Sequence, residues 1–156
     1  MLMRVSEPDL EEVLATGRAR ARPLGLRYAG ALLPREAHTL MQRLPGCCLV
    51  DVRSKAEWDF VGRVPGALEI EWKRYPGMQL NPAFVSQLAH QVPREAIVMF
   101  ICRSGARSHD TATLAASLGY EDAYNVLEGF EGDKDGAGHR NTVGGWRAAG
   151  LPWIQG

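Results

Sequence analysis

The sequence predicts an α/β fold in which helices flank a mostly parallel β-sheet. Two observations support this fold class. Short apolar segments alternate with helix-length segments from about residue 31 to residue 128, which is the pattern of strands joined by helical crossovers. Residues 96–101, AIVMFI, are apolar without polar alternation, which is typical of a strand that is covered on both faces.

The N-terminal segment is expected to form a helical extension. Residues 7–20 place apolar residues at helical spacing, and Ser6 is the expected N-cap. No residue in this segment is a candidate for chemistry. We therefore assign residues 1–27 to the extension and residues 28–156 to the main domain.

The elements of the main domain are predicted by apolar spacing and by helix start and stop signals. A proline opens the segment PREAHTLMQRL, and Asn81 with Pro82 marks the start of a later helix. Gly119 ends a third helix. The expected order is helix 34–44, strand 47–52, strand 66–70, helix 81–92, strand 96–101, helix 106–119, strand 123–128 and a weak helix over 142–150.

Composition excludes several classes of partner. The 156 residues fit one domain, and 46% apolar residues suffice for a core. Eighteen basic residues balance eighteen acidic ones, so we expect neither a nucleic-acid nor a membrane partner. The odd number of cysteines, three, favours a reducing compartment. We expect a cytoplasmic location, or a periplasmic one if a signal peptide has been removed.

A cysteine stands directly after the apolar strand 96–101, at the edge of the sheet where α/β proteins bind ligands. Cysteine thiolates are favoured at helix N-termini and beside cations. Gly105 permits a tight turn whose N–H groups attract an anion. Cys102 is therefore the predicted nucleophile. The predicted anion-binding cradle around it comprises Arg103, Ser104, Gly105, Ala106, Arg107 and Ser108.

Other residues of suitable type have simpler explanations. Cys47 and Cys48 lie in an apolar strand without basic or glycine-rich neighbours, so we interpret them as packing residues. His109 follows the loop on a predicted helix whose direction carries it away from the sulfur, and we interpret it as an ordinary polar residue.

Four stretches of the chain resemble the rhodanese (thiosulfate sulfurtransferase) family. They are DVRSKAEW at 51–58, GRVPGAL at 62–68, the Cys102 loop, and GFEGDKDGAGHRNTVGGWRAAGLPW at 129–153. Each stretch is weak alone, but their order and spacing together are specific. Arg63 stands where the family often has histidine, in a turn that we expect to be structural.

The resemblance implies a three-layer, rhodanese-like domain around a central parallel sheet, and a ping-pong sulfur transfer. Cys102 would take the outer sulfur of a small anionic donor such as thiosulfate and become a persulfide. A thiophilic acceptor such as cyanide or a thiol would then remove that sulfur. Arg103 or Arg107 would hold the donor. The resemblance implies no metal and no organic cofactor.

Four further residues are predicted to support the site. Asp51 and Arg53 face the loop region from a strand end, or form a buried ion pair that braces it. Arg53 and Glu57 are a second candidate pair. Trp72 follows a strand and either walls the pocket or packs in the core.

Two other functions stay open at this point. Cell-cycle phosphatases share the rhodanese fold and use Cys-x5-Arg, whereas here four residues separate Cys102 from Arg107. The shorter loop suits a sulfur atom better than a phosphate. A carrier or interaction module that delivers persulfide sulfur to a protein partner is the other alternative, because the sequence does not define the acceptor.

Overall fold

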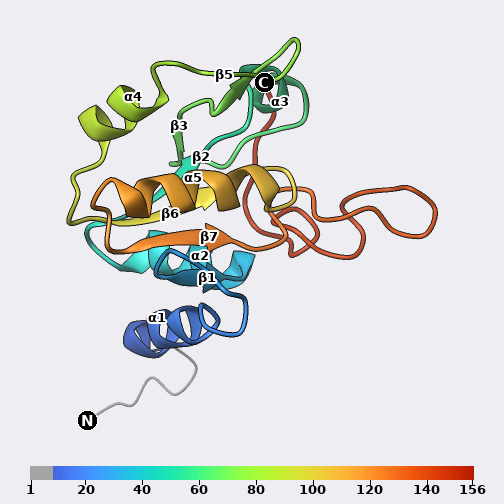
Figure 1. The fold of residues 1–156 in the computed structure, drawn as a ribbon. Helices are drawn as coiled ribbons and strands as arrows, with labels where there is room; N and C mark the ends of the chain where they lie inside the picture. The colour runs from blue at the N-terminus through green and yellow to red at the C-terminus, as the bar shows by residue number, and fades with distance from the viewer. Residues whose placement is uncertain (1–8) are drawn as a thin grey trace.

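The computed structural model describes residues 9–156 and has a five-stranded parallel sheet at its centre (Figure 1). The strand order is β1-β7-β6-β2-β3, and every neighbouring pair is parallel. This arrangement confirms the predicted fold class. The strands are β1 (Gly30–Leu32), β2 (Cys47–Asp51), β3 (Leu68–Glu69), β6 (Ile97–Ile101) and β7 (Ala123–Val126).

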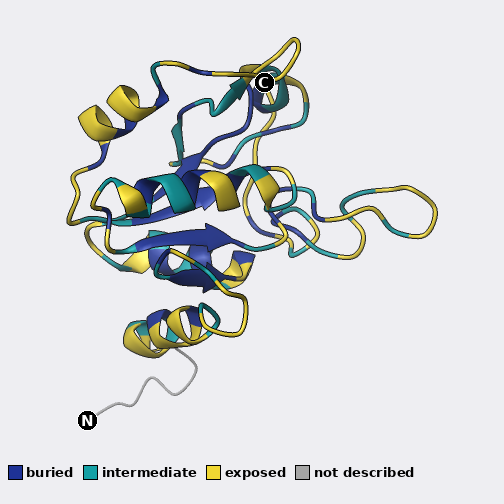
Figure 2. Ribbon diagram, viewed as in Figure 1, coloured by how far each residue is buried: buried dark blue, intermediate teal, exposed yellow. Residues whose placement is uncertain are grey.

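Helices cover both faces of this sheet and make the fold three layers deep. Because successive side chains of a strand point to opposite faces, β6 sends Val98 and Phe100 into one apolar cluster and Met99 and Ile101 into another. Figure 2 shows the resulting buried sheet between exposed helix surfaces. The helices are α1 (Leu10–Ala19), α2 (Pro34–Arg43), α3 (Lys55–Phe60), α4 (Phe84–Gln91) and α5 (Ala106–Ser117).

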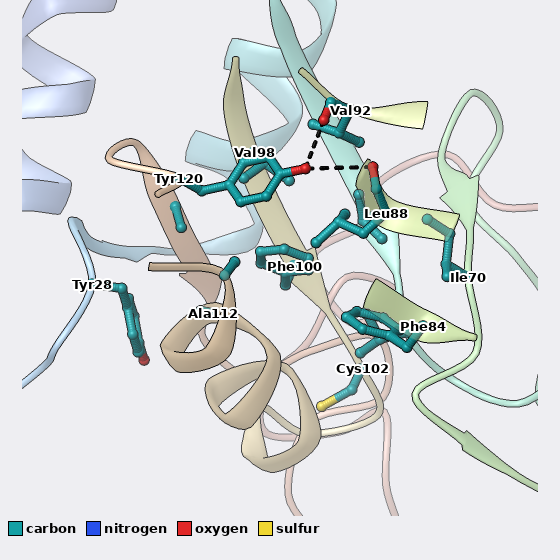
Figure 3. Close-up of a cluster of buried hydrophobic side chains, with 14 residues drawn as sticks. Tyr28, Ile70, Phe84, Leu88, Val92, Val98, Phe100, Cys102, Ala112 and Tyr120 are labelled. Carbon is teal, nitrogen blue, oxygen red and sulfur yellow. Dashed lines mark hydrogen bonds between the residues drawn. The ribbon is translucent and has the colours of Figure 1, made fainter. Parts of the chain in front are cut away.

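The cluster on the α4 and α5 face lies directly behind the candidate nucleophile. Phe84 and Leu88 of α4 and Ala112 of α5 pack there against the sheet (Figure 3). The Tyr120 hydroxyl donates to the Val92 carbonyl at 2.6 Å, so this buried polar group is satisfied. Cys102 lies at the margin of the cluster, with its sulfur near the start of α5 (Figure 3).

The opposite face packs against α1, α2 and the C-terminal segment. Leu14 of α1, Leu40 of α2 and the C-terminal Trp146 are all buried in the same cluster. Arg20 pairs with Glu36 at 2.6 Å and thereby ties the end of α1 to α2. The division of the chain at residue 27 stays a prediction.

Some predicted boundaries were wrong for local reasons. Helix α1 starts at Leu10 with Asp9 as its N-cap, because the Asp9 carboxylate accepts from the Glu11 N–H, and the predicted cap Ser6 lies outside the described residues. Helix α4 starts at Phe84, because Asn81 turns the chain by accepting from the Ala83 N–H rather than capping the helix directly.

Other elements differ from the prediction in kind. Residues 142–150 form turns instead of a weak helix, in a stretch with two adjacent glycines. Strand β1, helix α3 and the antiparallel hairpin β4 (Lys73–Arg74) and β5 (Gln79–Leu80) were not predicted, since each is too short to show a period. Within residues 9–156 no helix has both the length and the apolar content to cross a bilayer.

Candidate active site

Cys102 directly follows β6 at the carboxyl edge of the sheet, and its sulfur is held by the loop that follows. Gly105 has φ +113° and caps α5, a conformation that residues with a side chain rarely adopt. This turn aims the Gly105 N–H at the Cys102 Sγ, 3.1 Å away. The Ser108 hydroxyl lies 3.2 Å from the same sulfur. The loop therefore places the Gly105 N–H on the sulfur at a helix N-terminus, with the Ser108 hydroxyl within hydrogen-bonding distance.

Behind the sulfur, Asn125 of β7 orients the Ser108 hydroxyl. The Ser108 Oγ lies 2.6 Å from the Asn125 Oδ1. The Asn125 Nδ2 donates to the Gly105 carbonyl at 3.2 Å, which holds the turn itself. Because a hydroxyl has one hydrogen, Ser108 donates either to Asn125 or to the sulfur. Sequence reasoning missed Asn125, although a polar residue inside an otherwise apolar strand was the available signal.

The segment after β7 braces the loop from the other side. The Phe130 N–H donates to the Cys102 carbonyl at 2.8 Å, and the Glu131 N–H donates to the Arg103 carbonyl at 2.9 Å. Gly129 makes this contact possible, since a Cβ there would lie 2.5 Å from the Arg103 carbonyl carbon, and its φ is +65°. The carbonyls of Cys102 and Arg103 are thus satisfied by the segment after β7.

Arg107 forms a bidentate ion pair with Glu57, with hydrogen bonds of 2.7 and 2.8 Å. Glu57 is held in turn by Ser54, whose N–H and hydroxyl both donate to its Oε1. This is the reciprocal cap at the start of α3. The predicted pairing of Glu57 with Arg53 was wrong, because Glu57 lies on α3 opposite the first turn of α5.

The pair shifts the pKa values of both partners. Burial alone would raise the pKa of the Glu57 carboxyl, but the hydrogen bonds and charge of Arg107, with the donors of Ser54, lower it to about 2. Burial alone would lower the pKa of Arg107, and the hydrogen bonds and charge of Glu57 raise it. Both groups stay charged at neutral pH, so the pair adds no net charge to the site.

A cavity of about 270 Å³ opens in front of the sulfur and holds the cations that an anion would meet. Of the three basic residues on its wall, Arg107 is already paired, whereas Lys73 and Arg103 have no ion pair in the described part of the chain. Lys73 comes from the hairpin and was not predicted, because nothing in its local pattern marks it. The lining residues are Lys73, Met78, Cys102, Arg103, Ser104, Ala106 and Arg107.

Asp51 and Arg53 form a buried brace beneath the site. The Arg53 Nη2 donates to Asp51 at 2.7 Å and to the Gly62 carbonyl at 2.8 Å. The guanidinium carbon lies 4.1 Å from the centre of the Phe130 ring, in a cation–π contact. The pair therefore joins the end of β2 to the segment that braces the loop, which favours the bracing interpretation over direct contact with a ligand.

Trp72 packs in the core instead of lining the pocket. Its ring meets the Phe84 ring edge-to-face, with centroids 5.0 Å apart, and it joins the cluster on the α4 and α5 face. Its neighbour Lys73 and Met78, from the same hairpin, line the cavity of Cys102 instead. Of the two interpretations of Trp72, the structure favours core packing.

The remaining candidates lie as the simpler explanations predicted. Cys47 and Cys48 are half-buried in β2, and burial raises the pKa of the first thiol to about 12 and of the second to about 11. Neither is a thiolate at neutral pH. His109 is exposed, and its Nδ1 lies 2.8 Å from the Tyr28 hydroxyl.

A parallel α/β sheet with a cysteine cradled between a strand end and a helix N-terminus defines a class of rhodanese-fold proteins. Residues 34–135 match the family described as Rhodanese-like domain. This match covers more than half of the chain, and the protein therefore belongs to the rhodanese-like family.

Individual relatives agree with this assignment. A crystal structure of Rv0390 from M. tuberculosis is 43% identical, with a TM-score of 0.75, over 83% of this chain and 99% of that one. The Rickettsia rickettsii protein named "Uncharacterized protein RP600 homolog" is 36% identical over 67% of this chain and 80% of its own length. A human protein named thiosulfate:glutathione sulfurtransferase is 31% identical over 81% of this chain and 88% of its own.

Proposed function

We propose that this protein is a thiosulfate sulfurtransferase that works through a persulfide on Cys102. The observation that carries the proposal is the setting of one sulfur. It has the Gly105 N–H and the nearby Ser108 hydroxyl behind it, and a small cavity with two uncompensated cations in front. The relative named thiosulfate:glutathione sulfurtransferase supports this choice of donor and of reaction.

The two half-reactions follow from that setting. In the first, the Cys102 thiolate attacks the outer sulfur of thiosulfate, the sulfur–sulfur bond of thiosulfate breaks, and sulfite leaves with the electron pair. Lys73 and Arg103 attract the dianion into the cavity. In the second, cyanide or a thiol attacks the outer sulfur of the persulfide, and the electron pair of the broken bond returns to the Cys102 Sγ. No external oxidant or reductant is needed.

The hydrogen bonds around Cys102 stabilise its sulfur both as the thiolate and as the persulfide. The Gly105 N–H stabilises negative charge on the sulfur, as a preorganised donor does for a developing anion. The Ser108 hydroxyl adds a second donor when its hydrogen turns from Asn125 to the sulfur. The pair of Arg107 and Glu57 holds the first turn of α5 against α3, so that these donors keep their positions. A free thiol in a reducing compartment, such as the cytoplasm, suits this chemistry.

Mass spectrometry after incubation with thiosulfate tests the proposal. The wild-type protein is expected to gain one sulfur atom on Cys102 and to lose it to cyanide, with thiocyanate as the product. Cys102→Ser should gain none, whereas Cys47→Ser and Cys48→Ser should behave as wild type. If Cys102 gains no sulfur while the protein hydrolyses an aryl phosphate readily, the protein is a phosphatase of the same fold instead.

A further inference from the structure

A second and larger hollow adjoins the cavity of the nucleophile, and we call it the apolar pocket. Its volume is about 600 Å³, within the range of sites for small organic ligands. It shares Met78, Arg103 and Arg107 with the sulfur cavity, so the two hollows meet at the loop. Its lining residues are Ser54, Ala56, Glu57, Phe60, Val61, Tyr75, Met78, Arg103, Arg107 and Glu131.

The walls of the apolar pocket expose large apolar side chains to solvent. Phe60 is 78% exposed, Tyr75 69% and Met78 41%. They come from two separate elements, Phe60 from the end of α3 and the other two from the turn between β4 and β5, which lie at the same end of the molecule (Figure 1). Apolar side chains that converge on one hollow from different elements mark a binding site.

The charge at the junction of the two hollows is positive, because Arg103 and Arg107 line both hollows whereas Glu131 lines only the apolar pocket. Arg107 is compensated by Glu57, whereas Arg103 is exposed and has no ion pair among residues 9–156. A ligand in the apolar pocket that reaches the sulfur therefore meets one free guanidinium on its way. A carboxylate beside the reacting atom complements this charge, and a hydrocarbon group complements the walls beyond it.

We infer that the apolar pocket binds the sulfur acceptor, and that this acceptor is a small organic thiol with a carboxylate next to its thiol and an apolar side chain. The inference rests on the proposed function. Thiosulfate and cyanide are too small and too polar to gain from apolar walls. The acceptor sulfur attacks the outer sulfur of the Cys102 persulfide, the bond between the two persulfide sulfurs breaks, and its electron pair returns to Cys102. The acceptor leaves as a persulfide.

The test measures how fast the persulfide-loaded protein is discharged by 2-mercaptoalkanoates of rising side-chain length. The series runs from 2-mercaptopropanoate, with a methyl side chain, to 2-mercaptohexanoate, so every member has a secondary thiol next to a carboxylate. In wild type the second-order rate constant should rise by up to about fourfold for each methylene that enters the apolar pocket. Cyanide serves as the reference acceptor.

The double variant Phe60→Ser/Tyr75→Ser should lose most of this dependence on chain length. The preference for 2-mercaptohexanoate over cyanide should fall by about tenfold. Both side chains are largely exposed, so their removal takes little from the core. Leu24→Ser is the matched control, because Leu24 is also an exposed apolar residue but lies between α1 and β1, and it should keep the wild-type dependence.

Each outcome decides the inference. If wild type shows no dependence on chain length while cyanide discharges the persulfide, the inference is wrong and the proposed function stands. The inference is also wrong if the double variant keeps the dependence, or if only a protein thiol discharges the persulfide. If thiosulfate does not load Cys102, the proposed function fails. Ligand binding in the apolar pocket is then tested by how well carboxylic acids protect Cys102 from alkylation by iodoacetamide. Hexanoate should protect better than acetate in wild type but not in the double variant, and equal protection by the two acids in wild type overturns the inference.

Discussion

The Arg107 guanidinium faces the Glu57 carboxylate in parallel, with hydrogen bonds of 2.7 and 2.8 Å. The pair links the first turn of α5, which follows the nucleophile, to the first turn of α3. The charge of Arg107 is thereby compensated inside the protein, whereas Arg103 and Lys73 line the same cavity without an ion pair in the described part of the chain. The two arginines of the loop thus differ in their partners, although their sequence contexts are alike.

Arg103→Gln should raise the KM for thiosulfate by about tenfold, because the variant loses one uncompensated charged donor at an exposed position. Arg107→Gln should instead lower both stability and turnover, because it leaves the Glu57 carboxylate unpaired near the incoming dianion. Arg107→Gln/Glu57→Gln should recover most of the stability. Steady-state kinetics and thermal unfolding measure both effects. An unchanged KM in Arg103→Gln would assign donor binding to another residue.

Glu57 should make stability depend on pH in the acid range. Its pKa is about 2 in the folded protein, below its usual value of 4.5, so the carboxylate stabilises the fold above pH 4.5 and this contribution is lost as the pH falls towards 2. Glu57→Gln should therefore cost about 3 kcal/mol at neutral pH and progressively less below pH 4.5. Urea unfolding at several pH values measures the difference. A difference that is constant with pH would contradict the assignment.

Asn125→Ala should slow persulfide formation by about tenfold, because the Gly105 turn loses the amide that donates to its carbonyl and the Ser108 hydroxyl loses its fixed position. The double variant Asn125→Ala/Ser108→Ala should lose less rate than the product of the two single losses, since Asn125 acts partly through Ser108. Stopped-flow kinetics with thiosulfate measures the rate. Thr113→Ala is the control, because Thr113 is a hydroxyl on the same helix that donates to the His109 carbonyl rather than to Ser108. An equal loss of rate in Thr113→Ala would point to a general effect of destabilisation.

Gly129→Ala should reduce turnover by about 10²-fold, because a displacement of the loop by about 1 Å misplaces the donors around the sulfur. An added Cβ would lie 2.6 Å from the Cys102 carbonyl oxygen, so the loop or the segment after β7 must move. Gly136→Ala is the control, since a Cβ there meets nothing within 4 Å. Turnover and melting temperature should be compared for both variants. Wild-type turnover in Gly129→Ala would show that the loop does not depend on this contact.

The sequence by itself indicated the parallel sheet, most of its helices and the candidate nucleophile. These features depend on local patterns, namely the apolar strand 96–101, the helix start and stop signals, and a cysteine followed by Gly105 and basic residues. Such patterns can be recognised in a single sequence because their physical causes, burial and backbone geometry, act between residues that are close in the chain. Short elements such as β1 and α3 were not predicted because they span fewer than two full periods of their pattern.

Only the tertiary structure decided which groups surround the sulfur and what each one does. Arg107 meets Glu57 across 50 positions of sequence, and Asn125 meets Ser108 across 17. The hairpin brings Lys73 to the same cavity, while Trp72 turns into the core. Each assignment depends on which partner lies within hydrogen-bonding distance, and that distance is set by how helices and loops pack on the sheet rather than by the residue types alone.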